Sequence, residues 1–231
     1  KNRRSAIADE MKDTCEDCGP RGTMDGCNSL QIVIPVYNDW VCVQDLIPQV
    51  ARELEDLNIV ADVLIVDDGS TEPTPGLWKR CDGGIAEIRV LRLRRNLGHQ
   101  RAICVALCHL QAESRCQHVL VMDGDGQDAP ADIPILLHKL NENPQSRIVF
   151  AERARRADGC LFRLFYALYR CLHRLLVGHR VRVGNFSVMN RECLESLCTS
   201  PELWNHYAAC VFAARQPMAF APADRAKRLV G

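Results

Sequence analysis

Short apolar runs alternate with amphipathic segments along the chain from residue 30 onward. The runs are almost continuous in apolar residues, which is typical of strands buried on both faces of a sheet. They lie at 30–38, 61–67, 88–93, 118–123 and 147–151. Because segments with helical spacing follow several of these runs, the pattern predicts an α/β fold, with helices on both faces of a Rossmann-like, mostly parallel sheet.

The predicted helices carry start and stop signals. In the first, an apolar stripe of helical period runs over residues 46–57. Asp45 is its expected N-cap, because Pro48 is tolerated only in the first turn of a helix. The second helix is expected to open within residues 96–100, and the third to end at Asn143, which precedes a proline.

Residues 1–29 differ from the rest of the chain. They have no apolar period and are rich in Gly, Asp and Cys, which indicates a disordered or loosely attached leader. A single domain is predicted over residues 30–231. No stretch approaches the ~20 consecutive apolar residues that span a bilayer, and the N-terminus has no signal-peptide core. Since the chain begins at Lys1 without a methionine, we expect it to be part of a longer protein.

Charge and cysteine content narrow the class of protein. The 29 basic side chains equal the 29 acidic ones, which argues against a nucleic-acid partner. The 13 cysteines are scattered through predicted helices and do not have the spacing of a disulfide framework, which favours a reducing compartment. Cys15 and Cys18 form one CxxC pair without a second at zinc-site spacing, so we expect free thiols there.

Acidic side chains gather directly behind two predicted strands. Asp67 and Asp68 follow the second strand, and Asp123, Asp125 and Asp128 follow the fourth. In open parallel sheets, ligands bind beyond the carboxyl ends of the strands. Carboxylates this close together repel one another unless a cation lies among them.

The second acidic cluster has the ligands of a hard cation. Asp123 and Asp125 supply carboxylates, and Gln127 offers a carbonyl oxygen. Such oxygen ligands suit Mg²⁺ or Mn²⁺, which bind through one or two carboxylates together with substrate phosphates. We therefore predict a metal site at these three residues; a solvated acidic turn is the alternative.

Five motifs resemble those of the family 2 glycosyltransferases, in the same order and at similar spacing. They are IVIPVYN (32–38), VLIVDDGS (63–70), RRNLGHQRA (94–102), VLVMDGDGQDAP (119–130) and GNFSVMNR (184–191). Within this family the chain is similar to the polyprenyl-phosphate sugar transferases, such as dolichyl-phosphate mannose synthase and bactoprenol glucosyltransferase. The resemblance implies a GT-A fold over residues 30–231 and sugar transfer from a nucleotide-sugar donor with inversion.

The resemblance also implies roles for single residues. Asp67 would bind the nucleotide base, Asp125 would act at the catalytic centre, and Arg228 would lie on a loop that closes over the donor diphosphate. The residues expected to bind the nucleotide sugar are Pro35, Tyr37, Asp67, Asp68, Asn96, Gly98, Asp123 and Arg228.

The resemblance places Asn185 at a catalytic position, but this residue departs from the family pattern, in which the motif usually carries an Asp that acts as base or orients the acceptor. An amide cannot accept a proton at neutral pH. With a sugar hydroxyl as acceptor, loss of the base costs a factor on the order of a hundred or more in rate. A phosphate monoester is already anionic and attacks without a base, so Asn185 is compatible with a lipid-phosphate acceptor. A weak or inactive enzyme, or a base elsewhere, is the competing explanation.

A cationic segment fits such an acceptor. Residues 147–191 contain ten arginines, no lysine and two acids. Within a predicted basic amphipathic segment at 150–182, Arg163 and Arg170 lie on one helix face, which can rest on a membrane surface. With Arg153, which the resemblance places at the acceptor phosphate in a catalytic role, they are expected to bind the acceptor. A core helix whose arginines face water is the alternative.

Together these features predict a metal-dependent, inverting glycosyltransferase that moves a sugar to a polyprenyl phosphate at the cytoplasmic, inner face of a membrane. A soluble saccharide acceptor and a non-catalytic nucleotide-sugar-binding domain are the alternatives. A nucleotidyltransferase is disfavoured, because no Gly-, Arg- or Lys-rich loop follows the first strand.

Overall fold

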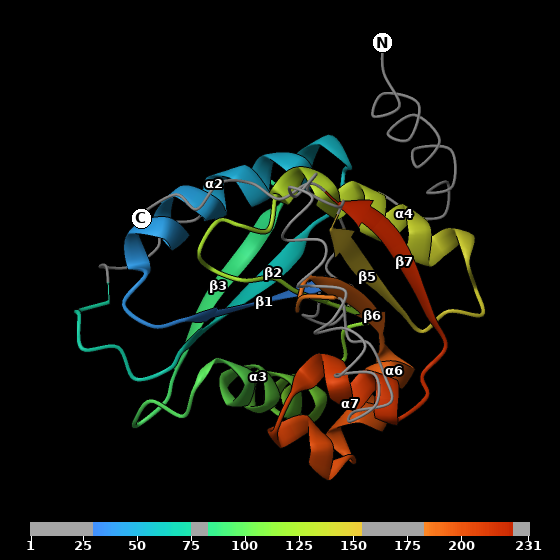
Figure 1. Cartoon of the computed structure of the whole chain (residues 1–231). Coiled ribbons are helices and arrows are strands. Elements are labelled where there is room, and N and C mark those ends of the chain that lie inside the picture. The colour runs from blue at the N-terminus through green and yellow to red at the C-terminus, as the bar shows by residue number, and fades with distance from the viewer. Residues whose placement is uncertain (1–29, 75–82, 154–182, 224–231) are drawn as a thin grey trace, which may run out of the picture.

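The described strands form one seven-stranded sheet in the computed structural model, which describes residues 30–74, 83–153 and 183–223 (Figure 1). The strands are β1 (Leu30–Val36), β2 (Ala61–Asp67), β3 (Ile85–Arg92), β4 (His118–Val121), β5 (Ile148–Arg153), β6 (Ser187–Asn190) and β7 (Met218–Ala223). Their order across the sheet is β3-β2-β1-β4-β6-β5-β7. Only β6, which pairs antiparallel with β4 and β5, departs from parallel pairing among these strands.

Helices cover both faces of the sheet. They are α2 (Trp40–Asp56), α3 (His99–Glu113), α4 (Ile133–Glu142), α6 (Arg191–Cys198) and α7 (Tyr207–Ala213), with short 3-10 helices η1 (Pro130–Asp132) and η2 (Pro201–Trp204). Figure 1 shows α2 and α4 on one face and α3, α6 and α7 on the other. The prediction of an α/β fold with a mostly parallel sheet and helices on both faces is confirmed.

The inner strand β1 is buried along its whole length because both of its faces pack against helices. Ile32 and Ile34 belong to the core that includes α2 and α4, whereas Val33 belongs to the core that includes α3 and α7. Successive side chains of a strand point to opposite faces, so burial on both sides requires a continuous apolar run. The register pairs Val36 with Asp67, so β1 and β2 end side by side at one edge.

The first helix begins earlier than the sequence indicated. α2 starts at Trp40 with Asp39 at the N-cap position, so the prediction of Asp45 as N-cap was wrong. Pro48 lies in the helix interior, where a proline costs about 3 kcal/mol. The earlier start buries Trp40 and Val43, and complete burial of side chains of this size contributes about 1.5–3 kcal/mol each. Because proline has no N–H, the carbonyl of Gln44 one turn earlier has no helical partner from Pro48. Both residues are exposed, so water can reach this carbonyl.

The sequence pattern did not predict two strands of the sheet, β6 and β7. β6 has only four residues, and β7 follows α7 directly after a short turn. β6 inserts between β4 and β5 and runs antiparallel to both. This insertion brings the start of the Ser187–Asn190 strand, and Asn185 just before it, to the edge where β4 ends.

Candidate active site

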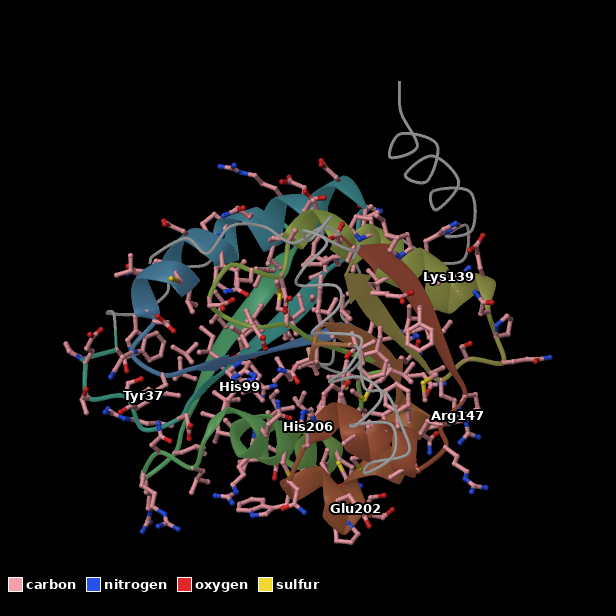
Figure 2. All side chains as sticks on the ribbon, in the orientation of Figure 1. Tyr37, His99, Lys139, Arg147, Glu202 and His206 are labelled. Atoms are coloured by element: carbon pink, nitrogen blue, oxygen red, sulfur yellow. The ribbon has the colours of Figure 1, made fainter. Side chains whose placement is uncertain are left out.

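A cleft of about 420 Å³ lies at the carboxyl ends of β1, β2 and β4. Two of its lining residues are labelled in Figure 2: Tyr37, which follows β1, and His99, the first residue of α3. The cleft is lined by Pro35, Val36, Tyr37, Asp39, Asp68, Asn96, Gly98, His99, Asp123, Gly124, Asp125 and Asn185. Eight residues predicted for the site, Pro35, Tyr37, Asp68, Asn96, Gly98, Asp123, Asp125 and Asn185, thus line one cavity, at the position expected for a ligand of this fold.

Asn38, which was not predicted as a site residue, links the end of β1 to the turn after β2. Asn38 has a positive φ of 58°, a conformation that Asn tolerates better than most residues. Its Oδ1 atom accepts hydrogen bonds from the backbone N–H groups of Thr71 (2.9 Å) and Glu72 (3.2 Å). Its own N–H donates to Ser70 Oγ at 3.0 Å. The turn after β2 is therefore tied to the end of β1.

The two neighbouring aspartates after β2 have different surroundings. Asp67 is fully buried and does not line the cleft; its Oδ1 accepts from the Ser70 N–H at 2.7 Å, and Oδ2 lies 3.3 Å from Arg92 Nε. Asp68 lines the cleft, and its two oxygens accept from the N–H groups of Leu97 (2.7 Å) and Gly98 (2.9 Å). Asp68 therefore anchors the loop that leads into α3.

Gly69 allows this loop to approach so closely. Its φ is +75°, and an added Cβ would lie 2.6 Å from the carbonyl carbon of Arg95. A side chain here would be strained by the backbone conformation and would also collide with a backbone that cannot easily move. The glycine of the VDDGS motif therefore has a steric explanation in this structure.

The acidic loop after β4 is folded back by its own carboxylates. Asp128 is buried, and its Oδ2 accepts from the Asp123 N–H at 2.8 Å. Asp125 Oδ1 accepts from the Gln127 N–H at 2.9 Å. A Cβ on Gly124 would lie 3.1 Å from the Pro35 carbonyl oxygen, so this loop passes close to the end of β1. The result places Asp123 and Asp125 on the cleft wall.

His99, at the start of α3, is a site residue that the sequence reading missed. Its Nε2 atom lies 3.1 Å from Asp123 Oδ1. Burial alone would lower the pKa of His99, but the hydrogen bond with Asp123 and the charges of Asp123, Asp125 and Asp128 outweigh this and raise the pKa above the usual 6.5. The only signal in the sequence was its position beside Gly98 in a quoted motif.

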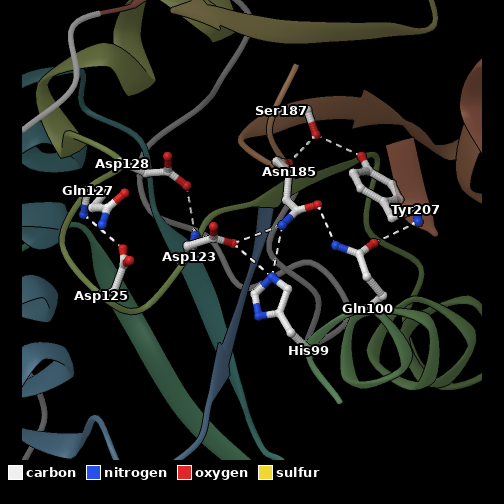
Figure 3. A network of polar contacts seen from close by, with 9 residues as sticks. All are labelled: His99, Gln100, Asp123, Asp125, Gln127, Asp128, Asn185, Ser187 and Tyr207. Atoms are coloured by element: carbon white, nitrogen blue, oxygen red, sulfur yellow. Dashed lines mark hydrogen bonds and ion pairs between the residues drawn. The ribbon is translucent and has the colours of Figure 1, made fainter. Parts of the chain in front are cut away.

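Asn185 is held within this cluster by both ends of its amide (Figure 3). Its Oδ1 atom accepts from Gln100 Nε2 at 3.1 Å, and its Nδ2 atom donates to Asp123 Oδ1 at 3.2 Å. The same Nδ2 atom lies 2.8 Å from His99 Nε2. His99 Nε2 accepts from Asn185 only when it carries no proton and donates to Asp123 only when it does, so the two hydrogen bonds exclude each other.

The donor set at the acidic loop fits a divalent cation that is shared with a substrate. Among the described residues, no three His, Cys, Asp or Glu side chains form a metal cage of their own. Asp123 and Asp125 nevertheless line one cleft with carboxylate oxygens, and Mg²⁺ usually binds through one or two carboxylates plus substrate phosphates. Gln127, in contrast, does not line the cleft, so its role as a third ligand stays a prediction.

Several predicted residues lie outside the described part of the chain. These are Arg163, Arg170 and Arg228, together with the leader at 1–29 and most of the 150–182 segment. Arg153 is the last residue of β5, and its side chain is likewise not described. Within residues 30–74, 83–153 and 183–223, no helix has the length and apolar character to cross a membrane.

The chain is similar in sequence to known glycosyltransferases. Residues 31–198 match the profile of the family described as Glycosyl transferase family 2. The uncharacterized glycosyltransferase YkoT of Bacillus subtilis is 30% identical over 181 residues, which are 75% of this chain and 52% of that protein. Dodecaprenyl-phosphate galacturonate synthase of Rhizobium johnstonii is 31% identical over 147 residues, 62% of this chain and 42% of the relative. The chain therefore spans about half the length of these relatives or less.

A solved structure shares the fold. Glucosyl-3-phosphoglycerate synthase from Mycobacterium tuberculosis, in complex with Mn²⁺, UDP-glucose and phosphoglyceric acid, superimposes with a TM-score of 0.62. The superposition covers 93% of this chain and 79% of the synthase, at 18% sequence identity. The predicted GT-A fold is thereby confirmed.

Proposed function

The chain belongs to glycosyl transferase family 2, and from this membership we propose that it transfers a sugar, with inversion, from a nucleotide-sugar donor to a polyprenyl phosphate. The donor would lie in the cleft at the strand ends, with its nucleotide beside Pro35, Tyr37 and Asp68. Those three residues line the cleft on the side of β1 and β2. Asp67 is a further candidate for recognising the base. It is buried, so it would act indirectly, by holding the turn at Ser70, whose N–H donates to Asp67 Oδ1.

The donor diphosphate would lie between the acidic loop and the loop anchored by Asp68. Asp123 and Asp125 would hold Mg²⁺ or Mn²⁺, with Gln127 as an additional candidate. A divalent ion bound there supplies a Lewis acid that neutralises charge on the departing nucleotide diphosphate. Asn96 and Gly98 also line the cleft, next to the start of α3, where backbone N–H groups attract anions.

The acceptor class rests on the chemistry of Asn185. Both ends of its amide are hydrogen-bonded, and an amide does not take up a proton at neutral pH. An acceptor that attacks from this position must therefore arrive already ionised or lose its proton to another group. A phosphate monoester meets the first condition, and the relative from Rhizobium johnstonii is a dodecaprenyl-phosphate galacturonate synthase.

The acceptor phosphate would be met by arginines. Arg153 stands at the end of β5, and Arg163 and Arg170 follow in the cationic segment. Guanidinium groups bind phosphate through two parallel hydrogen bonds. The same segment would rest on the cytoplasmic face of the membrane that carries the lipid, and Arg228 would close over the donor.

One observation carries the proposal: the two carboxylates Asp123 and Asp125 line a single cleft with Asn185, at the strand ends of a family 2 domain. The alternatives keep the donor site and change the rest. A soluble saccharide acceptor needs a base other than Asn185, and a non-catalytic domain would bind the donor without turnover.

The test is a donor and acceptor panel. The protein is mixed with Mn²⁺ or Mg²⁺, UDP- and GDP-sugars, and either undecaprenyl or dolichyl phosphate, and release of nucleotide diphosphate is followed. We expect release that depends on the lipid phosphate and is absent in Asp125→Ala. Release with saccharides alone would replace the lipid acceptor by a soluble one, and donor binding without any release would leave a binding domain.

A further inference from the structure

Two hydrogen-bond paths join Asn185 to Tyr207, a fully buried residue at the start of α7 (Figure 3). One path runs through Gln100 to the side chain of Asn185, and the other runs through Ser187 to its backbone carbonyl. Gln100, Ser187 and Tyr207 do not line the cleft. They come from α3, β6 and α7, so the paths connect three separate elements to one site residue.

The first path fixes which way the Asn185 amide points. The Tyr207 backbone N–H can only donate, and it donates to Gln100 Oε1 at 2.8 Å. The Gln100 NH₂ group is therefore the one that faces Asn185, where it donates to Oδ1 at 3.1 Å. As a consequence, the NH₂ group of Asn185 must face Asp123 and His99.

The second path fixes the backbone of Asn185. Ser187 Oγ donates its single hydrogen to the Asn185 carbonyl oxygen at 2.8 Å. The hydrogen between Ser187 Oγ and the Tyr207 hydroxyl, 2.7 Å apart, must then come from the tyrosine. Burial raises the pKa of the Tyr207 phenol, so this donor keeps its proton at all physiological pH values.

We propose that Gln100 and Tyr207 are positioning residues that hold the Asn185 amide with its NH₂ group toward Asp123. The proposal rests on the proposed function, since it assigns Asn185 to the metal-bearing side of that site. Its consequence is that Asn185 acts as a hydrogen-bond donor that orients a metal-binding carboxylate. The NH₂ group of Gln100 could also donate to an Asp at position 185, so this hydrogen bond is compatible with either residue.

The test uses paired variants on one helix. Gln100→Met removes both side-chain hydrogen bonds of Gln100, to Asn185 and to Tyr207, and keeps a similar volume. Gln111→Met makes the same change at the other end of α3. Tyr207→Phe removes only the hydroxyl group that contacts Ser187 and keeps the backbone N–H that donates to Gln100. Binding of Mn²⁺ alone is measured by calorimetry, and the Asn185 side-chain amide is followed by ¹⁵N NMR, its signal assigned by its loss in Asn185→Asp.

Removal of residues that orient metal ligands typically costs 10- to 100-fold in metal affinity or activity. We expect Gln100→Met to bind Mn²⁺ about tenfold more weakly, to shift the Asn185 amide signal, and to lower kcat at saturating Mn²⁺ with little change in the KM for donor. Tyr207→Phe should show a smaller effect, and Gln111→Met should match wild type in all three measurements.

Failure of this inference can be told from failure of the proposed function. If wild type shows no transfer to any acceptor but Gln100→Met still changes Mn²⁺ affinity and the Asn185 signal relative to Gln111→Met, the positioning role stands and the function is wrong. If Gln100→Met and Gln111→Met give the same Asn185 signal and the same Mn²⁺ affinity, the positioning role is overturned. Gln100→Glu adds a check of polarity: it should turn the Asn185 amide around, and an unmoved Asn185 signal in that variant also counts against the proposal.

Discussion

The amide nitrogen of Asn185 donates a hydrogen bond to Asp123 Oδ1 at 3.2 Å. A carboxylate in place of this amide would bring a second negative oxygen to the same distance from Asp123. Two carboxylates this close need a proton or a metal between them. In this chain the amide removes that need, so the cluster can be held together before any cation binds.

The first prediction concerns Asn185→Asp. In metal-free protein, the added carboxylate would lie beside His99 Nε2, which is 2.8 Å from the Asn185 nitrogen. An opposite charge at such a distance favours the imidazolium, so we expect the pKa of His99 to rise above its wild-type value. Titration of the His99 ring proton by NMR measures this. His118, whose pKa is lowered by burial at the other end of β4, is the internal control and should not move.

A second prediction follows from the raised pKa of His99 in wild type. A group with a raised pKa in the folded state contributes stability that is complete below its unfolded value of 6.5 and is lost as pH rises through the folded value. The free energy of unfolding of wild type, minus that of His99→Gln, should therefore fall as pH increases from 6 upward in metal-free buffer. Urea unfolding at a series of pH values gives this difference. A difference that rises with pH would contradict the sign.

Much of the cleft wall at the ends of β1, β2 and β4 could be predicted from local sequence. β1, β2 and β4 are buried on both faces, so their apolar runs are continuous, and their ends carry the acidic motifs directly. Asp68 and Asp123 were therefore identified from one rule, that polar residues behind a buried parallel strand face a ligand. The same rule failed for Asp67 as a lining residue, because successive residues at a strand end point to opposite sides.

The rest depended on contacts between distant segments. Gln100 and Tyr207 are 107 residues apart in the chain, and their hydrogen bond has no signature in either local pattern. β6 was missed because only Val188 and Met189 of its four residues are apolar, whereas the equally short β4 lies in a continuous apolar run. The place of β6 between β4 and β5 is set by pairing. His99 looks like an ordinary first-turn residue until Asp123 is placed beside it.

A third prediction compares two glycines that border the cleft loops, Gly69 after β2 and Gly98 before α3. Gly69 and Gly98 both have positive φ values, 75° and 94°, so alanine is strained at each by roughly 1–3 kcal/mol. At Gly69 the new Cβ also collides with the Arg95 backbone, whereas at Gly98 nothing lies within 4 Å. Overpacking typically costs about 1–3 kcal/mol. Gly69→Ala should therefore lose more unfolding free energy than Gly98→Ala by about that amount, as measured by urea denaturation, and equal losses would show that the loop at Arg95 moves aside.

The last prediction separates Asp125 from Asp123 by what each carboxylate already holds. Asp123 Oδ1 contacts Asn185 and His99, so Asp123→Ala would disturb the whole cluster as well as any metal. The only hydrogen bond described for the Asp125 side chain is with Gln127 of its own loop, which makes Asp125→Ala the cleaner test of metal binding. We expect the free energy of unfolding of this variant to stay within about 1 kcal/mol of wild type, since a single hydrogen bond of this kind contributes about that much. We also expect it to lose Mn²⁺-dependent binding of a nucleotide-sugar donor, measured by calorimetry with and without the ion. Asp45→Ala, on the exposed side of α2, is the matched control and should bind as wild type does.

Because folding and metal binding are measured separately, unchanged Mn²⁺-dependent donor affinity in a folded Asp125→Ala protein would remove Asp125 from the metal site.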